Sequence, residues 1–325
     1  MPELPEVETV KRGLERTIIG KTIQAVEIRV TKLFADDRQL IDQVLVGATV
    51  VAITRRAKVL LIEVSGGWTL AIHLKMTGQL VVRPPNSRIP ILDPTKFVGF
   101  AGGHPEKAYQ QPLPHKHSHV IIEFSEGTKL YFNDLRKFGW MKLLRGSSRL
   151  MNPALGITQK KVHPTLQILD SVFPTVDDFI MSLHLGPEPF SADFTVEYLM
   201  KLLKKRTIPI KQLLLEQKGI SGIGNIYADE ALFRSGIAPK RTALSLQLSE
   251  VQKLHRAIRE VLELGIKHGG TSKNTYLNVE GTRGEMQDHL KVYQRSKKPC
   301  IVCATPIKRI KIGARSAHFC PRCQK

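Results

Sequence analysis

The hydrophobic pattern changes its period near the middle of the chain, and this change limits the possible folds more than any other feature. From residue 22 to 143 the apolar residues form β-branched runs, and Gly66-Gly67 and Glu126-Gly127 give hairpin-turn signals. One helix is indicated before these runs, from about Pro5 to a stop at Gly20. Beyond residue 176 the period is that of helices. The chain therefore predicts an α+β protein with two domains.

Each half divides into recognisable elements. The leading helix places Val7, Val10, Leu14 and Ile18 on one face, and the runs that follow it predict an antiparallel β-sandwich. These runs are TIQAVEIRVT, TVVAITRRAKVLLIEV, WTLAIHLKMTGQLVV, HVIIEFSEG and TKLYFNDLRKFGWMKLL. The predicted helices are DDFIMSLHL, ADFTVEYLMKLLKKR, PIKQLLLEQKG, NIYADEALFRSG and LSEVQKLHRAIREVLELGIKHG.

These patterns also set the domain boundaries that we expect. The β-sandwich domain covers residues 1–146 and includes an insertion at 84–114, and a linker or second insertion covers 147–176. The helical domain covers 177–289 and contains a helix-two-turn-helix, and a zinc β-hairpin covers 290–325.

All four cysteines lie in the last 26 residues, as the pairs Cys300-x2-Cys303 and Cys320-x2-Cys323, which sixteen residues separate. Disulfides are the alternative interpretation, but paired CxxC units in a reducing compartment favour one structural Zn²⁺ on a β-hairpin. The segment between the pairs, TPIKRIKIGARSAHF, is rich in Lys and Arg. We therefore expect this zinc hairpin to contact phosphates.

The charge of the chain indicates a polyanionic partner. It carries 49 Lys and Arg against 29 Asp and Glu, a formal net charge of +20. Cations that neutralise phosphates release condensed counterions, so nucleic acid is the expected partner. No apolar run has the length of a membrane span and no signal segment is evident, so we expect a cytoplasmic protein without a membrane partner.

A glycine-rich segment in the helical half, LLLEQKGISGIGNIYADEALF, joins two predicted helices. One helix ends at Lys218, glycines occupy 219, 222 and 224, and Asn225 begins the next helix. Glycines allow two tight turns that aim backbone N–H groups and the Asn225 side chain outward, a suitable phosphate site. A plain helical hairpin is the alternative, and the basic composition favours DNA binding.

Seven motifs together resemble bacterial formamidopyrimidine-DNA glycosylase, in the order of that family and over nearly the whole chain. They are MPELPEVETV at the start, RRAK at 55–58, HLKMTG at 73–78, DLRKFG at 134–139, HLGPEP at 184–189, GIGNIYADEALF at 222–233 and the terminal FCPRCQK. The chain has DLRKFG where the family commonly has DPRRFG, and the segments 84–114 and 145–175 are longer than the family's usual connections.

The resemblance implies a catalytic site at the first residues. After removal of Met1, the secondary amine of Pro2 would attack C1′ of a damaged nucleotide, and an N-terminal amine titrates near neutrality. Glu3 would be the general acid, Glu6 would support the site, and Lys58 would contact the phosphates beside the lesion. Without the resemblance, the two glutamates would be explained by the dipole of their helix.

The resemblance also implies contacts with double-stranded DNA that contains damaged bases. Met76 and Phe138 would fill the gap left by the extruded base, and Arg136 would bond to the orphaned partner base. His73, Lys211, Asn225 and Arg315 match positions that contact phosphates or recognise the lesion. The segment 269–287 would form a loop over the extruded base. For Met76 and Phe138, packing in the core is the alternative.

The function implied is a bifunctional DNA glycosylase and abasic-site lyase of base excision repair, acting as a monomer in the bacterial nucleoid on 8-oxoguanine and formamidopyrimidines. One alternative is the related endonuclease VIII type, which removes oxidised pyrimidines and typically begins PEGPE. Another is a non-catalytic zinc-dependent DNA-binding protein. His115, His117 and His119 alternate before a strand, and a solvated strand edge explains them better than a second metal site.

Overall fold

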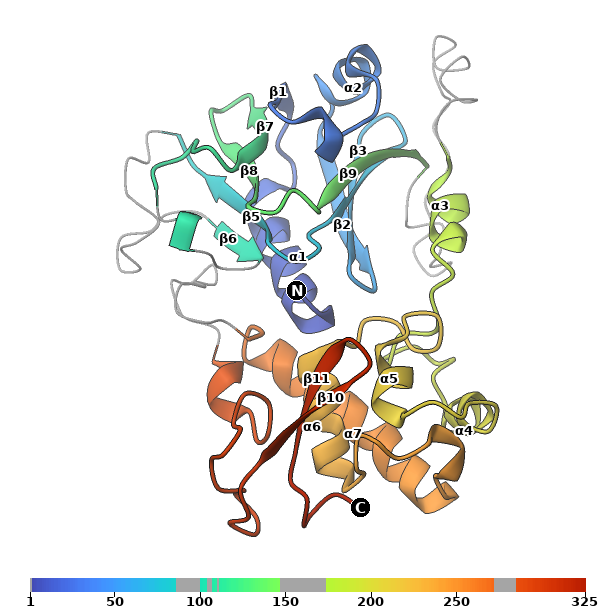
Figure 1. Ribbon diagram of the computed structural model, residues 1–325. Coiled ribbons are helices and arrows are strands. Elements are labelled where there is room, and N and C mark those ends of the chain that lie inside the picture. Colours follow the sequence, from blue (N-terminus) through green and yellow to red (C-terminus); the bar gives the residue numbers. More distant parts are fainter. Residues whose placement is uncertain (1, 86–99, 104–106, 110, 147–173, 272–284) are drawn as a thin grey trace. The chain divides into compact units, whose positions relative to one another are not determined.

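The computed structural model describes residues 2–85, 100–103, 107–109, 111–146, 174–271 and 285–325. It divides into two compact units (Figure 1). The first contains Pro2 and the described residues of Glu6–Leu183. The second contains Glu3–Pro5, His184–Thr271 and Glu285–Lys325.

The first unit is an antiparallel β-sandwich with a leading helix, as predicted. Its elements are α1 (Leu4–Ile18), β1 (Ile23–Ile28), a 3-10 helix (Thr31–Leu33), α2 (Arg38–Leu45), β2 (Val50–Arg56), β3 (Val59–Val64), β4 (Trp68–His73), β5 (Gly78–Arg83), β6 (Phe100–Gly103), a 3-10 helix (Lys107–Tyr109), β7 (Ser118–Phe124), β8 (Lys129–Asp134), β9 (Trp140–Arg145) and α3 (Val176–Ser182). One sheet has the order β1-β7-β8-β5-β6 and the other β2-β3-β4-β9.

Besides the passage from β1 to β2, the chain passes from one sheet to the other at two neighbouring places. The first crossing, at residues 74–77, joins β4 to β5, and the second, at 135–139, joins β8 to β9. Strands β5 and β8 pair to the end, with Gly78 opposite Asp134, and β4 and β9 pair with His73 opposite Trp140. This register brings the two crossings together at one corner of the sandwich.

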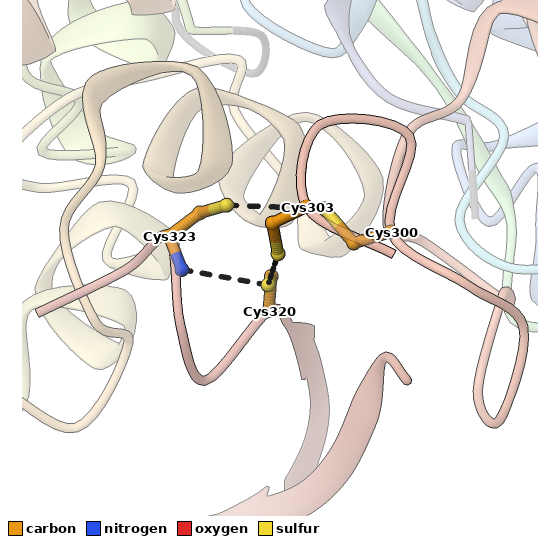
Figure 2. A group of neighbouring side chains, drawn as sticks. All are labelled: Cys300, Cys303, Cys320 and Cys323. Atoms are coloured by element: carbon orange, nitrogen blue, oxygen red, sulfur yellow. Dashed lines mark hydrogen bonds between the residues drawn. The ribbon is translucent and has the colours of Figure 1, made fainter. Parts of the chain in front are cut away.

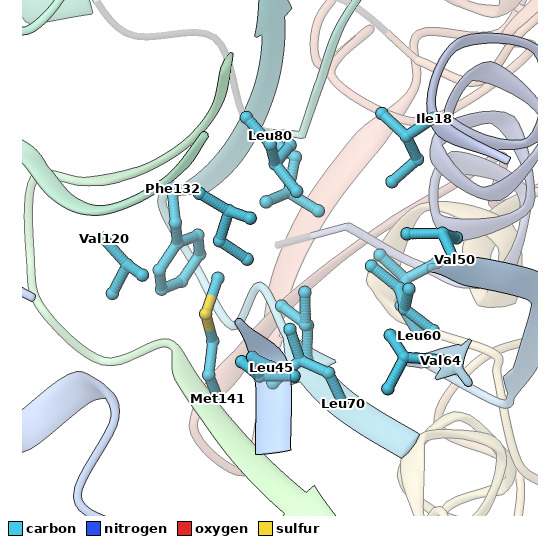
Figure 3. Packing of buried hydrophobic residues seen from close by; sticks show 14 of the residues in the cluster. Ile18, Leu45, Val50, Leu60, Val64, Leu70, Leu80, Val120, Phe132 and Met141 are labelled. Atoms are coloured by element: carbon cyan, nitrogen blue, oxygen red, sulfur yellow. The ribbon is translucent and has the colours of Figure 1, made fainter. Parts of the chain in front are cut away.

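The core of the first unit lies between the sheets and against α1 and α2. Residues from both sheets meet there, including Leu60, Leu70, Leu80, Phe132 and Met141 (Figure 3). Each Å² of apolar surface that is buried contributes about 25 cal/mol to stability, so the contact between the two sheets is the main stabilising term of this unit. The four predicted core residues of α1 are all fully buried.

The first unit differs from the sequence expectations in several features, among them the second crossing and helix α3. The pattern predicts strand throughout 128–144, but residues 135–139 form the second crossing, so Arg136 and Phe138 do not share a strand face. Helix α3, which the pattern groups with the helical half, packs Val176, Phe179 and Ile180 on the outer face of the second sheet. This cover explains why every residue of β3 is buried.

The second unit is a helical bundle that ends in a two-stranded hairpin. Its elements are α4 (Val196–Leu203), α5 (Ile210–Leu215), α6 (Asn225–Ser235), a 3-10 helix (Ala243–Ser245), α7 (Leu248–Lys267), a 3-10 helix (Met286–His289), β10 (Lys308–Ile312) and β11 (Arg315–Phe319). The four predicted helices after residue 190 are present, and α5 ends earlier than expected. Leu4 belongs to the core of this unit.

Candidate functional site

Met76, Arg136 and Phe138 lie together at the corner where the chain crosses between the sheets. The Arg136 guanidinium lies 3.3 Å from the Met76 sulfur and 4.8 Å from the centre of the Phe138 ring. Phe138 is 49% exposed, although a residue of its type is usually buried. Met76 and Phe138, predicted to fill the gap in the DNA, therefore lie in one cluster with Arg136, predicted to bond to the orphaned base. The core alternative does not hold for Phe138.

A buried carboxylate, Asp134, holds the backbone of both crossings. Asp134 accepts hydrogen bonds from the Thr77 hydroxyl, from Arg136 N at 3.1 Å and from Gly139 N at 2.7 Å. Gly78 and Gly139 are needed here, since a Cβ atom would lie 2.3 Å from the Leu74 oxygen and 2.6 Å from the Phe132 ring respectively. Sequence reasoning did not select Asp134 as a site residue, although an Asp that precedes a loop often bonds to its backbone.

His73, at the end of β4, is held as a neutral imidazole. Its Nδ1 accepts a hydrogen bond from Lys75 N at 2.9 Å, which places the ring proton on Nε2. Burial and the nearby charges of Lys75 and Lys58 lower the pKa of His73 to about 3. His73 is therefore a hydrogen-bond donor without charge at neutral pH.

The three predicted catalytic and supporting residues of the first unit are all buried. Pro2 precedes α1, Glu6 lies in the first turn of α1, and Lys58 follows Ala57 in the tight turn between β2 and β3. In the chain as written the nitrogen of Pro2 is joined to Met1, so a free amine requires removal of Met1. The roles assigned to these residues stay predictions.

Glu3 lies at the beginning of α6 in the second unit. Its carboxylate accepts hydrogen bonds from Ile226 N at 2.9 Å and Tyr227 N at 3.4 Å, where the helix dipole favours an anion. Glu3 is 3% exposed. The carboxylate thus interacts with the N-terminus of a helix that begins more than 220 residues away in the chain.

The glycines before α6 make room for residues 3 and 4. A Cβ atom at Gly224 would lie 2.3 Å from the Glu3 carboxyl carbon, and one at Gly222 would lie 2.6 Å from a Leu4 methyl carbon. Gly222 also has a φ of +91°, which favours glycine. The backbone is fixed further by Leu4 N, which donates to Gly222 O at 3.0 Å. The two turns predicted from these glycines therefore lie directly against Glu3 and Leu4.

Asn225, the first residue of α6, has a buried side-chain oxygen that lacks a hydrogen-bond partner among the described residues. Its side chain bonds to the Tyr293 hydroxyl. Tyr293 is placed by Glu230, whose carboxylate accepts from the backbone N–H groups of Lys291, Val292 and Tyr293 at 2.8–3.0 Å. An unsatisfied buried oxygen is uncommon, and a ligand or a water molecule at the start of α6 would satisfy it.

Lys211 is fully buried and joins three elements of the second unit. Its ammonium lies 2.6 Å from the Asp229 carboxylate and donates to Ser316 O at 2.6 Å. Asp229 also accepts from His318 N at 2.9 Å. Lys211 thus ties α5 to α6 and to β11 of the hairpin. The predicted contact between Lys211 and DNA stays a prediction, since the structure places the ammonium inside the protein.

The four cysteines form one cluster at the end of the second unit (Figure 2). The sulfurs of Cys300 and Cys323 lie 3.9 Å apart and those of Cys303 and Cys320 lie 3.4 Å apart. Tetrahedral Zn²⁺ with Zn–S bonds of about 2.3 Å separates its sulfurs by roughly 3.8 Å, whereas a disulfide needs about 2.05 Å. The geometry fits one structural Zn²⁺ and excludes disulfides within the cluster.

The hairpin that the zinc supports presents its basic residues to solvent. Arg315 begins β11 and is exposed, and with Arg309 and Lys311 it lines a shallow hollow. Arg309 donates to the Ser316 hydroxyl at 2.8 Å. The surface charge predicted for the segment between the cysteine pairs is therefore present, and contact of Arg315 with phosphate stays a prediction.

The three alternating histidines are not gathered as metal ligands in the described part of the chain. His115 stacks on Tyr109 with ring centres 5.6 Å apart, and His119 bonds to Asp134 O at 2.7 Å. Burial, with the charges of His117 and His119, lowers the pKa of His115 to about 4. His115 and His119 are buried, so the interpretation of the three histidines as a solvated strand edge is wrong.

These features define a class of protein, the zinc-finger proteins with a helix-two-turn-helix. The chain has a β-sandwich led by a helix, a helix pair joined by two glycine turns and a hairpin with four clustered cysteines. Within the described residues, no helix combines the length and apolar character that crossing a membrane requires.

Comparison with protein families gives the particular member of this class. Residues 1–141 match the formamidopyrimidine-DNA glycosylase N-terminal domain, 185–276 the H2TH domain of the same family, and 297–325 a zinc finger found in FPG and IleRS. The chain belongs to the formamidopyrimidine-DNA glycosylase family. Proteins of this name from Heliobacterium modesticaldum and Latilactobacillus sakei are 39% and 37% identical; the alignments cover all of this chain and 100% and 98% of theirs.

Solved structures agree with this assignment. The structure of Lactococcus lactis Fpg in complex with DNA that contains an abasic site is 32% identical, with a TM-score of 0.77 and 99% of each chain covered. Wild-type Lactococcus lactis Fpg with DNA that contains N7-benzyl-Fapy-dG is 31% identical, with a TM-score of 0.77 and 100% of each chain covered.

Proposed function

We propose that the chain is a bifunctional DNA glycosylase and abasic-site lyase that removes 8-oxoguanine and formamidopyrimidines from double-stranded DNA in the bacterial nucleoid. The observation that carries the proposal is the placement of Glu3. Its carboxylate is buried and held by two N–H groups at the start of α6, and it directly follows Pro2 in the chain. A fixed acid next to the amine is what this chemistry requires.

In the proposed reaction the nitrogen of Pro2 attacks C1′, the bond from C1′ to the damaged base breaks, and the proton of the amine passes to the departing base. Glu3 donates a proton to the sugar ring oxygen, the ring opens, and the electron pair on nitrogen forms an iminium with C1′. Loss of a proton from C2′ then expels the 3′ phosphate, and a second elimination expels the 5′ phosphate. Proline suits this role because its secondary amine yields a positively charged iminium that accepts electrons.

The remaining residues bind and position the DNA. Lys58 and Arg315 contact phosphates as cations, and His73 donates its Nε2 hydrogen without a charge. Asn225, the first residue of α6, offers its unpaired side-chain oxygen to the DNA. Lys211 acts at the same helix, where its ammonium pairs with Asp229. The net charge of +20 attracts the whole protein to the negatively charged DNA.

The cluster of Met76, Arg136 and Phe138 serves base extrusion. Phe138 and Met76 enter the space of the extruded nucleotide and offset part of the unstacking cost. The Arg136 guanidinium has only donors, so it pairs with the acceptors of the orphaned base, and cytosine offers more of them than adenine at its pairing edge. The exposed Phe138 ring supports this proposal.

The proposal is tested by trapping the iminium. Borohydride added during turnover of a duplex with 8-oxoguanine should join the DNA to the protein, and mass spectrometry should locate the DNA on the peptide that begins with Pro2. A protein that retains Met1 has an amide nitrogen at Pro2 and should bind the duplex without excision or trapping.

Glu3→Gln is the second arm of the test. It should spare DNA binding and stop base release, and the loss of one acceptor at the start of α6 should lower the free energy of unfolding by only about 1 kcal/mol. Excision at the full rate by the protein with a blocked N-terminus would reject Pro2 as the nucleophile. Turnover of oxidised pyrimidines alone in a panel of lesions would favour the endonuclease VIII alternative.

A further inference from the structure

A second group of metal-binding side chains lies apart from the cysteines in the second unit. His268 directly follows α7, Glu285 directly precedes the 3-10 helix Met286–His289, and His289 is the last residue of that helix. One ligand atom from each of the three lies within 4.8 Å of the other two. Neither the proposed reaction nor the zinc hairpin uses these residues.

The backbone that carries the three side chains is well anchored. His268 N donates to Leu264 O at 3.0 Å, which fixes residue 268 to the last turn of α7. Glu285 N donates to His268 O at 2.9 Å, so a backbone hydrogen bond joins residues 268 and 285. His289 stands between two buried residues, Met286 and Leu290. Because metal sites need ligands held by rigid elements, this support favours a real site over a chance grouping of surface residues.

The side chains are arranged to share one ion. The rings of His268 and His289 have their centres 3.8 Å apart, and the Glu285 carboxylate lies 3.7 Å from His268 Nδ1. Donor atoms that bind one ion at about 2.0–2.2 Å lie roughly 3.4 Å apart in tetrahedral geometry, so these three donor atoms, which lie within 4.8 Å of one another, must move closer to share an ion. The C-terminus of a 20-residue helix also lies at His268, and its partial negative charge favours a cation.

The ligand set selects the kind of ion. Two imidazoles and one carboxylate suit late first-row divalent metals such as Zn²⁺, Ni²⁺ and Co²⁺, whereas Mg²⁺ and Ca²⁺ prefer oxygen ligands alone. Three protein ligands leave positions for water. Since the Glu285 side chain is 66% exposed, the ion would exchange with solvent and bind less tightly than zinc at the four cysteines.

We propose that His268, Glu285 and His289 form a second metal site that binds one divalent transition-metal ion and joins the end of α7 to the 3-10 helix Met286–His289. The site is independent of the four cysteines, because it has no sulfur ligand and can fill while the zinc remains in the hairpin. Binding should raise the melting temperature, since the ion binds the folded chain in preference to the unfolded one.

The test uses the full chain without a histidine tag and with zinc in the hairpin. Equilibrium dialysis against Ni²⁺, followed by metal analysis, should find one nickel in addition to one zinc per chain. Co²⁺ at the second site should give visible d–d bands without the thiolate-to-metal charge-transfer bands that cobalt shows at four cysteines. This spectrum distinguishes the new site from replacement of the zinc.

Variants assign the site to its residues. His289→Ala and Glu285→Gln should each weaken nickel binding by about tenfold or more, as expected when a ligand is lost. Glu285→Gln keeps the backbone bond to His268 and alters an exposed side chain, so it should fold normally. His255→Gln, on the same helix, is the control for nickel bound by any surface histidine and should bind like the unaltered chain.

Three results would overturn the proposal: nickel absent beyond the zinc, equal nickel affinity in Glu285→Gln, His289→Ala and the unaltered chain, or charge-transfer bands that place the added cobalt on cysteine sulfur.

Discussion

At the scale of single residues, Asp134 explains how a cluster can be exposed in its side chains and yet fixed in its backbone. The carboxylate is fully buried, and its three bonds hold the loops that carry Met76, Arg136 and Phe138. The Arg136 side chain itself is exposed. Positioning by Asp134 and the proposed recognition by Arg136 are therefore separated between two residues two positions apart.

This separation gives a paired prediction. Arg136→Ala should change the free energy of unfolding by less than about 0.5 kcal/mol, yet remove most of the preference for 8-oxoguanine opposite cytosine over adenine. Asp134→Asn should cost about 2–3 kcal/mol, because an amide NH₂ faces a backbone N–H, and should reduce the preference as well. Urea unfolding and excision assays on both pairs measure the two effects, with exposed Asp193→Asn as the control. Equal excision of both pairs by the unaltered chain would reject the role of Arg136.

A second prediction at this scale concerns pH. The pKa of His73 is lowered to about 3, whereas in an unfolded chain it is about 6.5. Below pH 6.5 the unfolded chain takes up a proton that the folded chain refuses, so stability falls as pH drops from 6.5 toward 3, and His73 has no such effect above 6.5. The loss is about 2 kcal/mol at pH 5.

His73→Gln should remove that part of the loss between pH 7 and pH 5 in urea unfolding. Because His115 has a pKa lowered to about 4 and acts in the same direction, the quantity to compare is the difference between the variant and the unaltered chain. An identical pH dependence in the two proteins would show that His73 is not buried as a neutral ring.

Some of the residue-scale arrangement is open to sequence reasoning and some is not. The cysteine spacing alone predicts a tetrahedral site, because the ligands of such a site are local. The contact of Glu3 with the start of α6 joins residues more than 220 positions apart, and no periodicity encodes such a pair. The glycines at 222 and 224 are the available signal, since each marks a place where another chain segment approaches closely.

At the scale of elements, the ion pair of Lys211 and Asp229 sets the position of the hairpin on the helices. Burial lowers the pKa of Lys211, and the Asp229 carboxylate acts in the opposite direction. Desolvation of two charges is costly, so such a pair is retained for geometry more than for stability. Here that geometry brings together α5, α6 and β11, which carry Lys211, Asn225 and Arg315.

Breaking this pair should therefore be severe. Asp229→Ala should cost about 3–5 kcal/mol, because it leaves a buried ammonium without its counter-charge, and a second change, Lys211→Met, should recover part of the loss. The exposed pair of Arg234 and Glu260, which joins α6 to α7, is the matched control, and Glu260→Ala should cost less than about 1 kcal/mol. Urea unfolding measures the unaltered chain, Asp229→Ala, Lys211→Met, the double variant and Glu260→Ala. Additive losses in the double variant would show that the two charges do not depend on each other.

The elements that the sequence did not predict have physical causes. Helix α2 has only eight residues and lies between strands, so its pattern is too short to stand out, although Asp37 caps it by accepting from Gln39 N. Residues 135–139 lie between two strand-forming runs and were predicted to continue them, but the bonds to Asp134 hold their backbone in a loop. Tertiary contacts overrule local preference in such cases.

At the scale of the whole molecule, the two units have separate cores and separate supports. The first depends on a large apolar core between its sheets, whereas the hairpin of the second surrounds a small cluster that includes Val292, Ile307 and two of the cysteines. A hydrophobic cluster of that size cannot stabilise a fold without a metal. Both tryptophans, Trp68 and Trp140, lie in the first unit, so their fluorescence reports on that unit alone.

Zinc removal should consequently disable one unit and spare the other. Treatment with a chelator, or Cys320→Ser, should unfold the hairpin and abolish measurable DNA affinity, while tryptophan fluorescence and its urea unfolding curve stay those of the intact chain. Added zinc should restore binding to the chelated protein and not to the Cys320→Ser variant, which separates loss of metal from irreversible damage. If DNA affinity survived complete loss of zinc, the hairpin would not be part of the DNA-binding surface, and the basic residues around Arg315 would need another explanation.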